Sequence, residues 1–71
     1  MDREMQWRHL REAERHIAQG QRNIADQEAR IADLSHNGHD TELARRLLNS
    51  FREIQAQHIA HRDFIIQQIE Q

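Results

Sequence analysis

The chain has 71 residues, of which 31% are charged, and ten basic residues stand against twelve acidic ones to give a net charge of −2. This balance argues against a strongly basic nucleic-acid binder, and the absence of cysteine excludes disulfides. A domain of this length has a marginal core unless metals or oligomerisation support it. We therefore expect self-association or a bound partner.

The composition favours helix throughout the chain. Proline is absent, glycine occurs twice, and good helix formers dominate. No apolar run approaches the roughly 20 residues of a membrane span, and the polar N-terminus is not expected to act as a signal peptide. We expect an all-α protein located in the cytoplasm.

The first predicted helix covers about residues 2–35 and repeats its pattern every seven residues. Two positions of each repeat form an apolar seam of the coiled-coil kind. Gly20 lies on this seam although glycine costs about 1 kcal/mol in helix propensity relative to alanine. Its place predicts a neighbour that needs the room. The seam residues are Leu10, Ala13, Ile17, Gly20, Ile24, Gln27, Ile31 and Leu34.

A turn is predicted at residues 36–40, the only place where the helical pattern stops and restarts. Gly38, preceded by Asn37, suits the left-handed conformation that ends a helix. Asp40 or Thr41 can then cap the first free N–H groups of a second helix. The chain 1–71 is thus predicted to form a single helical hairpin.

The second predicted helix covers about residues 41–70 and carries a seam of the same spacing. If the two helices pack antiparallel about the turn, the seams match in a register that places Gly20 opposite His58 and Ile24 opposite Ile54. This agreement predicts an all-α, two-helix antiparallel coiled-coil hairpin. The predicted seam residues are Ala44, Leu47, Phe51, Ile54, His58, His61, Ile65 and Gln68.

A second apolar face remains outside the two seams, on one flank of the predicted hairpin. A stripe this wide suits a bundle better than an isolated pair of helices. We expect two hairpins to associate through it as a homodimer, giving a four-helix bundle. Alternatively, its isoleucines pack loosely on their own hairpin. The predicted interface residues are Trp7, Leu48, Ile59, Ile66 and Ile69.

Six histidines are an unusual number for a chain of this length. His58 and His61 lie three residues apart, and the predicted register brings His16 within about one turn of His61. Helical histidine sets can bind a metal inside a bundle, so these three are the candidate metal ligands. The alternatives are that the seam histidines are neutral polar breaks that set the register, or that they sense pH. No other cofactor is indicated.

Arginine residues repeat along the outer side of the first helix, where Arg8, Arg15 and Arg22 lie seven residues apart. They could follow the phosphates of a nucleic acid. Acidic residues are interleaved and no aromatic residue accompanies them for base stacking, so a solvated face is the favoured interpretation. The chain also lacks a cysteine nucleophile, a glycine-rich phosphate loop and a supported serine triad. We expect a non-enzyme.

The segment GHDTELARRLLNSFREIQAQHIAHRD, residues 38–63, resembles a pattern in small helical proteins of alphaproteobacteria. The resemblance rests on a Gly-x-Asp-Thr turn, a following Ala-x-x-Leu-Leu and a later histidine. It implies a bacterial, cytoplasmic protein and brings no assigned activity or ligand. The prediction is a small helical adaptor or regulator that works through protein contacts. The alternatives are a histidine-dependent metal-binding bundle and an arginine-face nucleic-acid accessory.

Overall fold

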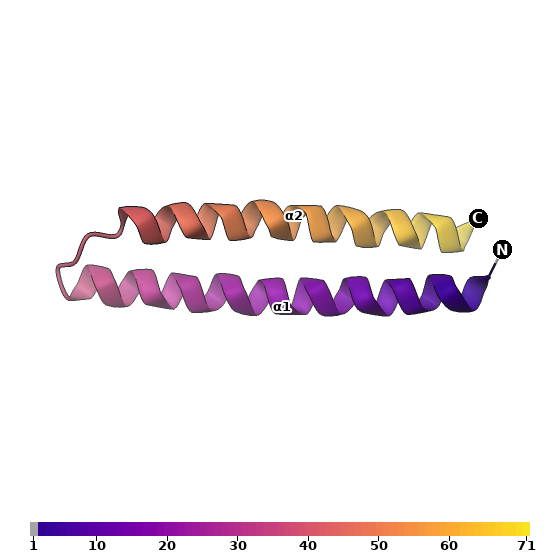
Figure 1. Ribbon diagram of the computed structural model, residues 1–71, viewed down its shortest axis with the longest axis horizontal. Coiled ribbons are helices and arrows are strands. Elements are labelled where there is room, and N and C mark those ends of the chain that lie inside the picture. Colours follow the sequence, from indigo (N-terminus) through magenta and orange to yellow (C-terminus); the bar gives the residue numbers. More distant parts are fainter. Residues whose placement is uncertain (1) are drawn as a thin grey trace.

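A computed structural model describes residues 2–71 as two antiparallel helices. Helix α1 spans Arg3–His36 and helix α2 spans Glu42–Glu70. The two ribbons run side by side, with the connection at one end and both termini at the other (Figure 1). The described residues contain no strand. The predicted all-α hairpin is therefore confirmed, and its helix bounds agree with the predicted ones to about one residue.

The hairpin is a rod with principal extents of 56 × 14 × 12 Å. Its radius of gyration is 16.3 Å, against about 11 Å for a compact domain of this length. Two helices alone cannot enclose a core, because each has only one neighbour. Most side chains consequently remain on the surface.

Local hydrogen bonds define both ends of α1. The Asp2 Oδ1 atom accepts from the backbone N–H groups of Glu4, at 3.0 Å, and Met5, at 3.3 Å, which caps the helix N-terminus. At the other end Gly38 has φ +75°, and its N–H donates to Ser35 O at 3.1 Å. The predicted left-handed glycine is confirmed.

The turn then leads into α2 through Asp40 and Thr41. The Asp40 Oδ1 atom accepts from Glu42 N at 3.0 Å and so acts as the cap. Thr41 makes no capping bond, and its hydroxyl instead accepts from Arg45 Nε at 2.9 Å. Of the two predicted capping residues, Asp40 performs the role.

The seam of α1 is as predicted. In α2 one of the two predicted rows of seam residues is confirmed, with Ile65 buried and Phe51 half-buried, and the other row is displaced by one position. In α1 the buried residues are Ala13, Ile17, Gln27 and Ile31, all from the predicted seam. In α2 the predicted seam residues Leu47 and Ile54 are 45% and 48% exposed. The residues that α2 buries are Leu48, Gln55 and Ile65.

The predicted register between the helices is wrong by three residues. Gln55, and not His58, lies against Gly20. The Gln55 side chain crosses the seam there and donates from Nε2 to Ile17 O at 2.9 Å. A Cβ atom at position 20 would lie 2.7 Å from Gln55 Cδ, closer than real contacts allow. Gly20 does make room for a neighbour, as predicted, but the neighbour is a glutamine.

Candidate interaction surface

Four large hydrophobic side chains of α2 remain exposed beside the interhelical seam. Leu43 is 80% exposed, Leu47 45%, Ile54 48% and Phe64 57%. At 3.6 residues per turn these positions fall within an arc of about 100° on one side of the helix. We call these four residues the outer stripe.

A groove lies beside the outer stripe at the turn end of the hairpin. It has a volume of about 440 Å³ and runs between the last turns of α1 and the first turns of α2. Leu34, Leu43 and Leu47 give it an apolar lining, and Arg30 and Asp40 stand among its polar lining residues. The outer stripe therefore borders a hollow that can accept a side chain.

A second, smaller groove of about 170 Å³ follows near the middle of the hairpin. Its lining includes Gly20 from α1 and Phe51 and Ile54 from α2. The rings of His16 and His58 also line it, and their centroids are 5.3 Å apart at a tilt of 43°. Because both grooves contain outer-stripe residues, the stripe and the hollows share one flank of the hairpin.

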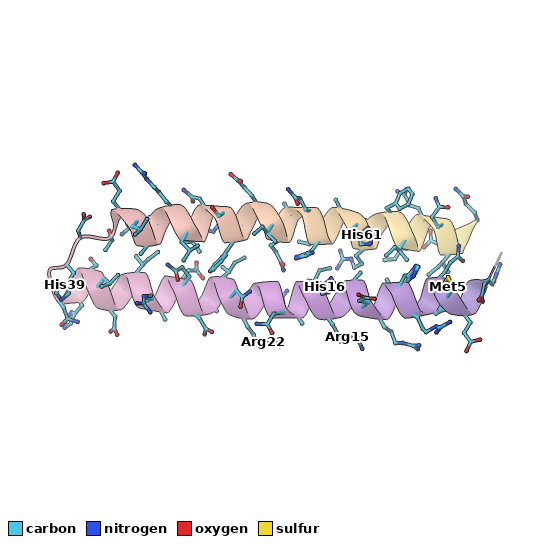
Figure 2. All side chains as sticks on the ribbon, in the orientation of Figure 1. Met5, Arg15, His16, Arg22, His39 and His61 are labelled. Atoms are coloured by element: carbon cyan, nitrogen blue, oxygen red, sulfur yellow. The ribbon has the colours of Figure 1, made fainter. Side chains whose placement is uncertain are left out.

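The structure does not assemble the predicted metal ligands into one site. His16 lies against His58, and it also lines a third groove with His61, His9 and Glu12. Figure 2 labels His16 on α1 and His61 on α2. Within residues 2–71, however, no group of three or more histidine, aspartate or glutamate side chains is placed to hold a metal ion. His16 and His61 are exposed and His58 is half-buried.

The predicted interface residues do not form one free face. Leu48 is only 7% exposed because α2 turns it toward α1, so its predicted place on a free surface is wrong. Ile66 and Ile69 are half-buried. Only Trp7, at 48%, and Ile59, at 38%, are well exposed. The flank of the hairpin opposite the outer stripe, on which the interface was predicted, is polar near its middle, where Arg52 Nη2 lies 3.2 Å from Glu28 Oε2.

The predicted arginine face lies on the outside of α1. Arg15 and Arg22 project from the side of α1 that faces away from α2 (Figure 2). Arg22 Nη2 donates to Gln19 Oε1 at 2.8 Å.

Neither α1 nor α2, the helices of residues 2–71, contains an apolar stretch of the length that a membrane span requires.

The sequence analysis did not predict the burial of Gln55 or the outer stripe. Gln55 is 7% exposed, as is Gln27 of the predicted seam, and Gln27 Nε2 donates to Ala44 O at 2.9 Å across the seam. The outer stripe was missed because Leu47 and Ile54 were assigned to the seam. Its signal was present in the sequence, since Leu43, Leu47, Ile54 and Phe64 fit a second apolar spacing on the same helix.

Comparison of the chain with protein-family models, curated proteins and solved structures finds no match. The resemblance of residues 38–63 to small alphaproteobacterial helical proteins stays a prediction.

Proposed function

We propose that the hairpin is a non-enzymatic protein-interaction module that works through self-association into a four-helix bundle. The observation that carries this proposal is the imbalance between its buried and exposed apolar residues. Among residues 2–71, seven large hydrophobic residues are at least 38% exposed, and no side chain is less than 2% exposed. The buried apolar residues are Ala13, Ile17, Ile31, Leu48 and Ile65.

The outer stripe supplies enough apolar surface for a reversible dimer. Fully burying a leucine, isoleucine or phenylalanine side chain contributes about 1.5–3 kcal/mol. Covering the exposed parts of the four stripe residues on two copies would contribute on the order of 7–14 kcal/mol. Association itself costs about 4–15 kcal/mol, so the other contacts between the copies decide the affinity. A concentration-dependent dimer is the expected state.

The shape of the hairpin supports a role in binding over one in catalysis. Active sites are usually concave pockets that surround most of a small substrate. The grooves described above are shallow troughs along a rod only 14 Å and 12 Å across in its shorter dimensions. Such troughs suit the side chains of another helix, as in a bundle.

The proposal is tested by the solution mass of untagged protein, measured by light scattering on a sizing column over a wide range of concentrations. The expected result is a rise toward twice the 8.5 kDa of one chain. Circular dichroism of the same samples reports whether the helices are formed. A fully helical protein that keeps the mass of one chain at every concentration would refute self-association.

A further inference from the structure

We infer that the second copy packs on the outer stripe, with the two α2 helices antiparallel and Phe64 of each copy inserted in the turn-end groove of the other. This inference rests on the proposed self-association and assigns its face and direction. It replaces the predicted interface around Ile59, Ile66 and Ile69 with the opposite flank of α2.

The largest exposed apolar side chain of this flank and the larger of its two grooves described above lie near opposite ends of α2. Phe64 is 57% exposed near the C-terminal end of α2. The turn-end groove, lined by Leu34, Leu43 and Leu47, has a volume of about 440 Å³. An enclosed cavity of about 150 Å³ can already hold a benzene molecule, so this groove has room for a phenyl ring.

The direction of packing follows from the separation of these two features. Seventeen residues separate Leu47 from Phe64, which is about 25 Å along a helix. In a two-fold dimer, only an antiparallel pair of α2 helices can bring the Phe64 side chain of each copy to Leu47 of the other. The two-fold axis then passes close to Ile54 and Gln57, midway between the two contacts. Parallel α2 helices would place Phe64 against Phe64 and leave each groove without its ring.

A second copy fits this surface better than a different partner does. A partner that only filled the groove would leave Phe64 and Ile54 exposed. To cover the whole stripe, a partner must present both an aromatic side chain and an apolar groove at the matching separation. Another copy of this chain presents both, and a two-fold axis satisfies the two grooves and the two rings together.

Cysteine cross-linking tests the arrangement, because the natural chain contains no cysteine. Leu47→Cys and Phe64→Cys are made as separate variants at exposed positions, and circular dichroism verifies that each remains helical. The two proteins are mixed, allowed to exchange subunits and treated with a short thiol-reactive cross-linker. The matched control mixes Phe64→Cys with Ile59→Cys, an exposed isoleucine of α2 outside the stripe.

The expected result is a covalent dimer in the mixture of Leu47→Cys and Phe64→Cys, and little or none in either variant alone or in the control mixture. Strong cross-linking of each variant with itself would overturn the inference in favour of parallel helices. A protein with dimeric mass that forms no cross-link in the mixture would show that the outer stripe is not the interface. The proposed self-association would still hold. A helical protein with the mass of one chain would overturn both.

Discussion

Large apolar residues occur on both sides of α2, whereas a self-sufficient hairpin would confine them to the inner side. The inner side buries Leu48 and Ile65 against α1, but it also includes a buried glutamine, Gln55, and a half-buried histidine, His58. The outer stripe, in contrast, presents two leucines, an isoleucine and a phenylalanine at 45–80% exposure. Because apolar side chains gain most from burial, this distribution indicates a helix that is covered on both sides.

The interhelical seam loses stability at its two buried glutamines, Gln27 of α1 and Gln55 of α2. Gln27 and Gln55 each donate to a backbone carbonyl of the opposite helix at 2.9 Å. The Gln55 Oε1 atom, however, is buried without a hydrogen-bond partner. An unsatisfied buried acceptor costs about 1–3 kcal/mol. As with buried polar residues in coiled coils, we expect Gln27 and Gln55 to fix the register of the helices at some cost in stability.

The largest expected effect comes from truncating the inner seam. Ile31 is 6% exposed, so Ile31→Ala removes buried methyl groups and leaves a cavity. We expect the free energy of unfolding to fall by about 2–5 kcal/mol. Urea denaturation followed by circular dichroism measures the change. Ile54→Ala, on the outer stripe, is the matched control, and at the lowest workable concentration it should change the stability far less. Equal losses would contradict the distinction between the two sides.

A smaller effect is expected where Gly20 meets Gln55. Gly20→Ala improves helix propensity by about 1 kcal/mol, but its methyl group displaces the Gln55 side chain and the bond to Ile17 O. We expect a net loss of about 1–2 kcal/mol in the free energy of unfolding.

In a Gln55→Ala background the clash is absent, so Gly20→Ala should stabilise the hairpin by up to about 1 kcal/mol. Denaturation of all four proteins gives the coupling between the two positions. Should Gly20→Ala change stability by the same amount in both backgrounds, the close contact between Gly20 and Gln55 does not set the register.

The smallest change in stability is expected from substitutions in the turn that joins α1 and α2. Gly38 has φ +75°, and a Cβ atom added there would meet no heavy atom within 4 Å. Gly38→Ala should therefore cost only the conformational penalty of about 1 kcal/mol. Gly38→Asn should cost less, because asparagine tolerates this conformation better. Thermal unfolding checks both variants. A cost for alanine well above this figure would show that the turn makes contacts beyond its backbone shape.

The sequence predicted the architecture because the turn chemistry and the seam of α1 are each unambiguous. Gly38 and Asp40 mark the turn, and Ile17 and Ile31 each have only an alanine as an apolar neighbour in the sequence. In α2, adjacent leucines at 47 and 48 support two seams that differ by one position, and apolar spacing alone cannot choose between them.

The choice depends on Gln55, whose side chain bonds to the α1 backbone and fills the space at Gly20. In α2 the apolar spacing favours Ile54 over its neighbour Gln55 as the seam residue. The wrong seam position in α2 also made the predicted surface wrong. Because Leu47 and Ile54 were predicted to lie in the seam, they were not expected to be exposed. The candidate interface was consequently predicted on the wrong flank.

The most direct test of the account compares the solution masses of two charge variants of α2. Leu47→Glu places a carboxylate in the outer stripe, and Ile59→Glu places one about 120° away around the helix. The two wild-type side chains are similarly exposed, at 45% and 38%. Light scattering should give the mass of one chain for Leu47→Glu, at concentrations where Ile59→Glu and the wild type are dimers. A dimeric Leu47→Glu beside a monomeric Ile59→Glu would contradict the account.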